Sequence, residues 1–221
     1  MTLTPGQRLP AGQARLRELQ RGTTIEAALA FYDALEPVGL EEMIGSWQGE
    51  DLPTGNPFDG LLGRFGWYGK RFDGPDHGHP LVFIASPGRM MSLNPAFVPI
   101  GVLIRYPWLV RAPFVPRLFC VLRPLLATGK PTARLRLTAY RGVVTATMCY
   151  DALPINDVFR KVDNNTVLGA MDLRGLQTPL MFVLRREPLE APDSAQRGGA
   201  RGAMNTPVEL TAVNNPASTD A

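Results

Sequence analysis

The chain has 221 residues, of which 45 % are apolar, 23 are Lys or Arg and 20 are Asp or Glu, giving a net charge of +3. This length is sufficient for a globular domain with a sizeable hydrophobic core. The basic residues are spread along the chain without a concentrated run, which argues against nucleic acid as the main partner. No stretch has the roughly 18 consecutive apolar residues of a membrane-spanning helix.

The amino terminus and the cysteines indicate a cytoplasmic protein. The first residues, MTLTPGQRLPAG, lack the apolar core of a secretory signal. Cys120 and Cys149 are far apart and do not form a C-x-x-C pair, so we expect buried or free thiols in a reducing compartment. The 21 prolines and 22 glycines favour short strands and many turns over long helices.

The first predicted elements are helical. Residues 1–22 are polar, and we expect them to form a flexible arm. Thr23 and Glu26 have the spacing of a capping box. The apolar residues behind them recur at helical spacing, which predicts an amphipathic helix over residues 24–35. A short helical turn over residues 39–43 then leads into the next motif.

A Gly-x-Trp-x-Gly motif follows at Gly45, Trp47 and Gly49. Glycines in a strand let a neighbouring strand or ring approach where a Cβ atom would collide, and the tryptophan supplies a large apolar plug. Trp47 is therefore expected to close one end of a β-barrel or sheet. A turn around a core tryptophan with no special role is the alternative interpretation.

Two strands and a long proline-rich segment come next. The aromatic stretch 65–72 and the apolar run 80–85 are predicted strands. Residues 87–130 are apolar, but frequent prolines argue against a regular helix or a central strand over most of this length. One interpretation is an insertion that folds over the core. The other is a basic and apolar flap that contacts a membrane through residues 98–126, or closes over a lipid-like ligand.

Clear strand patterns return after residue 130. Apolar and polar residues alternate over 133–140, and the turn Arg141-Gly142 leads to a second strand over 143–150. Further strands are predicted over 158–162 and 167–171, joined as a hairpin, and over 180–186. The composition beyond Glu187 predicts a disordered tail over 188–221. Roughly eight to ten short strands are typical of an antiparallel barrel or sandwich.

Two groups of residues resemble known families. Trp47 with its glycines, and the run Trp67-Tyr68-Gly69-Lys70-Arg71-Phe72, resemble the GXWXG family. The later motifs resemble the domain of unknown function that usually follows it: Tyr140-Arg141-Gly142, Tyr150-Asp151, residues 154–163 and residues 168–172. Together the two resemblances cover about residues 24–86 and 130–187.

A fold-level resemblance to lipocalins and nitrobindins implies how the barrel is closed. Those barrels open with a Gly-x-Trp motif after a short helix, and in lipocalins a basic residue on the last strand covers the Trp ring. Here Arg185 or Arg186 stands on the last strand and is expected to cover Trp47. Nitrobindins bind haem through a histidine on a late strand. This chain has only His77 and His79, so no cofactor is expected.

The fold class expected from these observations is mainly β. We predict an antiparallel lipocalin-like β-barrel with an N-terminal helix and a Pro-rich insertion. The barrel is a single domain over residues 23–187, between the arm and the tail. It divides into the GXWXG part (24–86), the insertion (87–130) and a C-terminal part (131–187).

The densest polar set in the C-terminal half is one candidate site: Asp151, Asp157, Arg160, Lys161, Asp163 and Asp172. One arrangement of the strands directs Arg160, with Asp157 or Asp172, into the barrel interior. A guanidinium fixed there could hold a carboxylate or phosphate group. An ion-pair network that stabilises the hairpin would use the same residues.

Two further groups of residues are candidates for a site. Lys70 and Arg71 follow the aromatic strand, and one of them should point inward, unless they belong to a solvated edge strand. His77 and His79 are close in sequence, and Asp73 and Asp76 could complete a metal site with them. A surface turn is the preferred interpretation, and no metal is expected.

We therefore expect a protein that binds or carries a small hydrophobic ligand with an anionic or polar head group inside the barrel. The expected ligand contacts are Trp67, Tyr68, Lys70, Phe72, Asp157 and Arg160, with Trp47 and Arg185 as a structural plug. The first alternative is a lyase, isomerase or hydrolase with Asp151, Asp157 or Asp172 as general base and Arg160 as charge stabiliser. The second is a partner-binding module that uses the apolar surface of residues 98–126.

Overall fold

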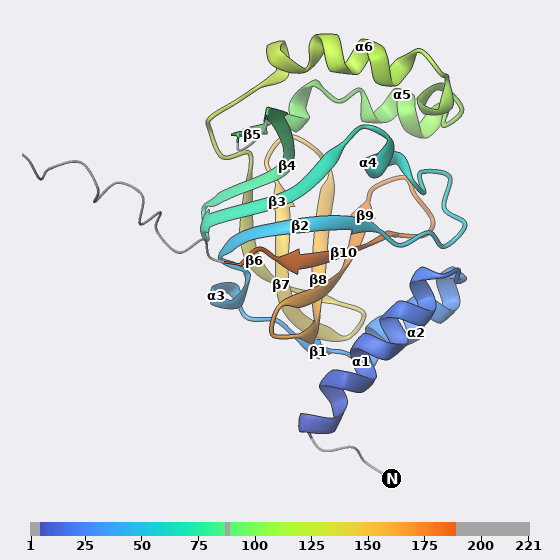
Figure 1. The fold of residues 1–221 in the computed structure, drawn as a ribbon, viewed down its shortest axis with the longest axis vertical. Coiled ribbons are helices and arrows are strands. Elements are labelled where there is room, and N and C mark those ends of the chain that lie inside the picture. Colours follow the sequence, from blue (N-terminus) through green and yellow to red (C-terminus); the bar gives the residue numbers. More distant parts are fainter. Residues whose placement is uncertain (1–4, 87–88, 189–221) are drawn as a thin grey trace, which may run out of the picture. The chain divides into compact units, whose positions relative to one another are not determined.

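Eight antiparallel strands form a closed barrel, which confirms the predicted mainly β, lipocalin-like fold (Figure 1). The computed structural model describes residues 5–86 and 89–188. The strands are β1 (Glu36–Pro37), β2 (Gly45–Asp51), β3 (Trp67–Gly74), β4 (His77–Ser86), β5 (Arg89–Ser92), β6 (Ala133–Tyr140), β7 (Val143–Tyr150), β8 (Ile155–Asp163), β9 (Thr166–Leu173) and β10 (Leu180–Arg186). The α-helices are α1 (Pro5–Gln20), α2 (Ile25–Asp33), α3 (Leu40–Met43), α4 (Leu61–Arg64), α5 (Ile100–Arg105) and α6 (Val115–Leu122).

The ring of strands runs β8-β7-β6-β4-β3-β2-β10-β9, and pairing of β9 with β8 closes it. Most neighbours share long ladders, but within the described ranges the register of β4 with β6 has a single pair, Gly78 with Ala133. The insertion leaves the ring between these two strands, and in Figure 1 its helices α5 and α6 lie at one end of the barrel. The weakest seam of the ring is therefore where the insertion begins and ends.

Local sequence signals account for most of the elements. The alternating patterns of residues 133–140 and 143–150 form β6 and β7, and residues 180–186 form β10, with the predicted bounds. The N-cap of α2 is Thr24 rather than Thr23, and its hydroxyl accepts a hydrogen bond from the Ala27 N–H at 3.3 Å. The capping interaction is thus one residue later than the sequence spacing indicated.

Residues 1–22 were expected to be a flexible arm, and from residue 5 on the structure differs. They form α1 over Pro5–Gln20, in which Leu16 and Leu19 are buried. These leucines pack with Tyr32 of α2 and with Val162 and Leu168 on the outer face of the barrel. The apolar positions are few, but they fall on the face that the outer surface of β8 and β9 can cover.

The insertion contains short helices, contrary to the expectation that prolines would prevent them. Alongside α5 and α6 it has 3-10 turns over Pro95–Phe97, Leu109–Arg111 and Arg123–Leu126. The prolines lie at or next to the start of these elements, for example Pro99 before α5 and Pro116 in the first turn of α6. In the first turn a backbone N–H has no helical partner, so proline is tolerated there.

Two hydrophobic clusters fill the inside and the outside of the barrel wall. The interior cluster contains Trp47, Trp67, Phe72, Phe159 and Phe182. The outer cluster lies between the wall and helices α1 and α2. The compact unit ends at Glu187, and the tail expected beyond it lies, from residue 189 on, outside the described residues. Among the described helices none is long and apolar enough to cross a membrane.

Candidate functional site

A buried ion pair lies inside the barrel. The Lys70 ammonium is 2.6 Å from Oδ2 of Asp157, and their side chains are only 4 % and 1 % exposed. Lys70 comes from β3 and Asp157 from β8, on separate parts of the ring. Removing two charges from water costs several kcal/mol for each ion. The attraction between the two ions offsets only part of this free energy. A pair in this position is therefore weak as a stabilising device and is a candidate for function.

Aromatic rings surround the ammonium. Its nitrogen lies 5.4 Å from the ring centre of Trp67, 5.5 Å from that of Tyr150 and 5.1 Å from that of Phe182. It also donates a hydrogen bond to the Tyr150 hydroxyl at 3.3 Å. The faces of these rings carry partial negative charge that favours the cation. The site is thus a polar centre of Lys70, Asp157 and Tyr150 in an apolar, aromatic wall.

An irregularity in β3 brings Trp67 and Lys70 to the same side of the sheet. The β3–β4 register shifts on both sides of Gly69. Side chains alternate in a regular strand, so residues three apart would face opposite ways. The extra residue of a bulge changes this alternation, and both Trp67 and Lys70 are buried while Tyr68 is only half-buried.

The polar centre has unused hydrogen-bonding capacity. The second carboxylate oxygen of Asp157, Oδ1, is buried and has no hydrogen-bond partner within the described part of the chain. Burial, and then the nearby Asp157 carboxylate, raise the pKa of Tyr150 well above its ordinary value of 10.0. The phenol therefore keeps its proton at neutral pH and can donate it to Asp157 or to a group placed beside it. A group placed here would meet one free acceptor and one hydroxyl.

Arg160, expected in the interior, lies on the other side of the wall. In β8 it shares the outer face with Val162, while Asp157 and Phe159 face inward. Its guanidinium lies over the Tyr32 ring at 5.3 Å and donates to the Leu35 carbonyl at 3.2 Å. The expected partnership of Arg160 with Asp157 is therefore wrong, because residues three apart in this regular strand face opposite ways.

The other charged residues of the C-terminal set are spread over the surface. Asp151 pairs with Arg134 at 2.8 Å, Lys161 with Glu42 at 2.5 Å, and Asp163 accepts a hydrogen bond from Gln13 at 2.5 Å. Asp172 is exposed beside Asn156 and Arg174, in a shallow hollow of about 210 Å³. The expectation that Asp172 orients Arg160 in the interior is not met, since neither side chain lies there.

The remaining aromatic candidates divide in the same way. Phe72 is fully buried in the interior, where its ring meets that of Phe159 edge to face. Tyr68 instead points away from the interior and donates a hydrogen bond to the Glu187 carboxylate. Tyr150 and Phe182 of the interior site were not among the expected ligand contacts. Strand alternation could have identified Tyr150, because it shares a face with the buried Ala146 and Met148.

The plug is built from Trp47 and Arg186. Trp47 is 1 % exposed, and its indole N–H donates to the Met43 carbonyl at 2.8 Å. The guanidinium of Arg186 lies 4.3 Å from the ring centre. Arg185 was also expected in this role, but it faces outward toward Gln20 and Glu50. Arg186 is directly opposite Trp47 in the β10–β2 register, which places it over the ring.

The two histidines lie in β4 rather than in a turn. His79 is buried, and its Nε2 is 3.4 Å from Oδ2 of Asp73. Burial, followed by the charge of Arg71, lowers the pKa of His79 below its ordinary value. Within the described ranges no group of three or more His, Cys, Asp and Glu side chains is placed to hold a metal ion.

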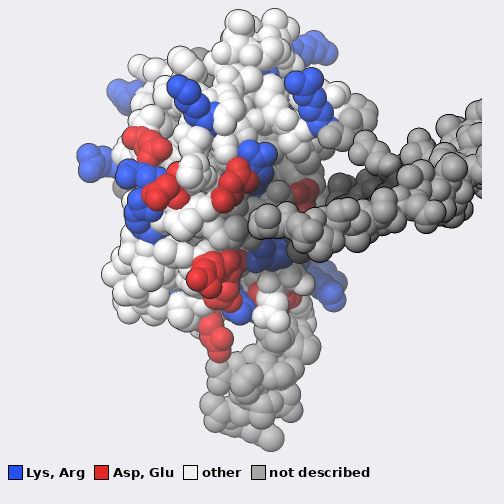
Figure 2. Space-filling model, turned by 90° about the vertical axis from the view of Figure 1, so that its left-hand side faces the viewer, with Lys and Arg blue, Asp and Glu red and all other residues white. Residues whose placement is uncertain are grey.

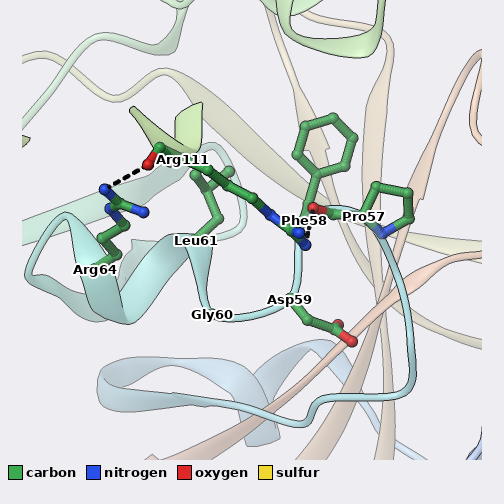
Figure 3. A pocket seen from close by; sticks show the side chains of 7 residues that line it. All are labelled: Pro57, Phe58, Asp59, Gly60, Leu61, Arg64 and Arg111. Atoms are coloured by element: carbon green, nitrogen blue, oxygen red, sulfur yellow. Dashed lines mark hydrogen bonds between the residues drawn. The ribbon is translucent and has the colours of Figure 1, made fainter. Parts of the chain in front are cut away.

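Besides the hollow at Asp172, the structure has a hollow between α4 and the insertion, outside the barrel interior (Figure 3). It has a volume of about 260 Å³ and is lined by Pro57, Phe58, Asp59, Gly60, Leu61, Arg64 and Arg111. Both arginines on its wall are hydrogen-bonded to backbone carbonyls. Arg64 donates to the Arg111 carbonyl at 2.9 Å, and Arg111 donates to the Pro57 carbonyl at 3.2 Å. These bonds fasten the insertion to the loop before α4.

Comparison with known proteins identifies both halves of the barrel. A family model described as "GXWXG protein" matches residues 30–88, and a model described as "Domain of unknown function (DUF4334)" matches residues 131–186. The chain is also similar to a solved structure, the crystal structure of a protein from Thermomonospora curvata. The two are 31 % identical, the match covers 81 % of this chain and 99 % of the other, and the TM-score is 0.59. No curated protein matches.

Proposed function

The chain belongs to the GXWXG family, with a DUF4334 domain following the GXWXG part, and from this premise we propose that it binds a small, mainly apolar ligand inside its barrel, in the cytoplasm. The observation that carries the proposal is the Lys70–Asp157 pair, buried in an aromatic wall with one carboxylate oxygen unused. Ligand sites are mostly apolar, with a few placed polar groups that fix orientation.

The polar part of the ligand is inferred from the charges of the site. Asp157 neutralises Lys70 at 2.6 Å, and the other expected cation, Arg160, lies outside the interior. A ligand anion would therefore bring an unbalanced charge into a low-dielectric interior, which is costly. A hydroxyl can donate to Asp157 Oδ1, and a hydroxyl or carbonyl can accept from Tyr150. An uncharged polar head group thus fits better than an anionic one.

Binding to a series of matched probes tests this proposal. The full chain is titrated, by calorimetry, with an alcohol, a ketone, a carboxylate and an alkane of one chain length. We expect the alcohol to bind tightest and to lose about tenfold in affinity in Asp157→Asn, because the amide oxygen stays with Lys70 and an N–H group replaces the free acceptor Oδ1. Asp172→Asn, a matched change on the surface, should leave binding unchanged. Equal affinities for all four probes, or no binding of any, would contradict the proposal.

An enzyme on the same barrel remains a second candidate, favoured by the same unpaired oxygen. Asp157 is the one predicted general base that lies inside the barrel, and the protonated Tyr150 beside it could act as the acid. The charge-stabilising role assigned to Arg160 would pass to Lys70, which contacts Asp157 directly. A lyase of this kind would remove water from the bound alcohol and an isomerase would move a proton next to the ketone, whereas a hydrolase would need an ester or amide probe, whose bond water splits. Recovery of the probe unchanged after prolonged incubation would support binding alone.

A further inference from the structure

The insertion carries a large exposed apolar surface. Among the described residues, exposed large apolar side chains concentrate between residues 97 and 125: Phe97, Val102, Tyr106, Trp108, Phe114, Leu118, Val121, Leu122 and Leu125. Trp108 is 65 %, Val121 75 % and Leu125 79 % exposed. Soluble monomers rarely expose a contiguous apolar patch of this kind unless it contacts a partner or a membrane.

Helix α6 is apolar on two sides. One side packs on the barrel, where Phe119 meets Phe65 at 5.1 Å and Phe83 at 5.5 Å between ring centres. On the other side, Leu118 and Val121 of the helix continue the line of Phe114, its N-cap, and Leu125, in the 3-10 turn that follows, and all four are exposed. A helix that packs on its own domain normally turns polar residues to solvent. The outer stripe of this helix therefore lacks a partner within the described residues.

The charge around this stripe has one sign. From His77 to Tyr150 the sequence has no Asp or Glu, and the exposed cations of the insertion include Arg105, Arg117 and Lys130. On the face shown in Figure 2, the end of the barrel that the insertion occupies is white and blue, while the red acidic atoms lie further down. The surface thus combines exposed aromatic and aliphatic side chains with uncompensated positive charge.

We propose that this insertion surface docks the protein on the headgroup region of an anionic lipid bilayer. Amphipathic segments with Lys or Arg beside Trp, Phe and Leu insert their apolar side chains at this depth, and anionic lipids attract the cations. Tryptophan and tyrosine favour the same interface, which accounts for the exposure of Trp108 and Tyr106. The helices α5 and α6 have six and eight residues and would lie at the interface.

Other occupants fit the charge less well. In a symmetric dimer the patch meets a second copy of itself, so the cations of each copy would meet a surface of the same charge. A protein partner would need a complementary acidic surface around an apolar groove. A bilayer offers both an apolar layer and negative headgroups without further requirements. The inference does not depend on what the barrel binds.

Vesicle flotation with the full chain tests the proposal. The protein is mixed with vesicles of phosphatidylcholine, either alone or with phosphatidylserine, at low and at high salt. We expect binding to the mixed vesicles at low salt and loss of binding at high salt or without phosphatidylserine. The fluorescence of the tryptophans should shift to the blue on binding. Trp108 is the exposed member of the three, since Trp47 and Trp67 are already buried.

Variants separate this surface from the rest of the molecule. Val121→Ser with Leu125→Ser should weaken vesicle binding about tenfold or more, because two exposed apolar anchors are lost. Arg105→Gln with Arg117→Gln should weaken it about fivefold for each charge removed. The matched controls are Leu137→Ser with Val144→Ser, at exposed apolar positions on β6 and β7, and Arg21→Gln. Both controls should bind as the unaltered protein does.

Two results would overturn the proposal. One is absence of vesicle binding at low salt. The other is a stable dimer in analytical ultracentrifugation that is broken by the Val121/Leu125 change and excludes vesicles, which would assign the stripe to a second copy. Because the altered side chains are exposed, the variants should fold, and circular dichroism will verify this.

Discussion

Arg186 lies over the indole ring of Trp47, with its guanidinium carbon 4.3 Å from the ring centre. It also donates to two backbone carbonyls, those of Glu42 and Ile44, the latter at 2.7 Å. Replacing Arg186 by Ala should lower the free energy of unfolding by about 2–3 kcal/mol, because a cation–π contact and two hydrogen bonds are lost together. Urea denaturation measures the change.

The neighbouring residue supplies the control. Arg185 faces outward, and its contacts with Gln20 at 3.4 Å and Glu50 at 3.9 Å are both long. Arg185→Ala should therefore cost less than about 1 kcal/mol. Equal losses for the two variants would show that the position over the Trp47 ring is unimportant.

The close packing at Gly49 leads to a second prediction. A Cβ atom there would lie 2.1 Å from the Trp67 ring, so Gly49→Ala requires the indole or the strand to move. We expect a loss of about 3 kcal/mol or more in unfolding free energy. Gly101→Ala, in helix α5 with nothing within 4 Å of the added atom, should be neutral or slightly stabilising. If thermal melting gave the two variants similar midpoints, steric crowding at Gly49 would not be the cause.

Breaking the Lys70–Asp157 pair by changing one partner should lower the free energy of unfolding strongly. Replacing both partners by apolar residues should change it little. Lys70→Met or Asp157→Leu alone leaves a buried, unpaired charge and should cost about 3–5 kcal/mol. The double variant removes both charges, and we expect its stability to be within about 1–2 kcal/mol of the unaltered protein. A double-mutant cycle by urea denaturation measures this coupling. Additive losses would mean that the two side chains do not share one site.

The lowered pKa of the buried His79 side chain predicts that the stability of the fold depends on pH. Its pKa in the folded state is lowered below 6.5, chiefly by burial. The unfolded chain therefore binds a proton near pH 6.5 that the folded chain resists, so the contribution of His79 is absent above this pH and destabilising below it. His79→Gln should make the unfolding free energy fall less steeply between about pH 6.5 and pH 5. Parallel pH profiles for the two proteins would refute this assignment.

The barrel could be predicted from the sequence because each strand has a recognisable pattern of apolar and polar residues within its own length. The alternation in residues 133–140 and the apolar run 180–186 define strands with little outside information. The outward position of the Arg160 side chain could also have been predicted from the sequence. Asp157 and Arg160 are an odd number of residues apart in a regular strand, so alternation alone places them on opposite faces.

Other features depend on contacts that a single sequence does not display. The inward position of Lys70 next to Trp67 arises from the irregularity around Gly69 in the pairing of β3 with β4. The choice of Arg186 over Arg185 follows from the register of β10 with β2. The burial of Leu16 and Leu19 in α1 requires the outer face of the barrel, which tertiary packing alone provides.

The central claim is that the buried Lys70–Asp157 pair serves to hold a ligand. Native mass spectrometry of the full chain purified from its own host, compared with the double variant Lys70→Met with Asp157→Leu, tests it most directly. We predict a co-purifying apolar molecule with a hydroxyl or carbonyl group on the unaltered protein, and its loss from a double variant that remains folded. A bare mass for the unaltered protein, or equal retention of the molecule by both proteins, would contradict the claim.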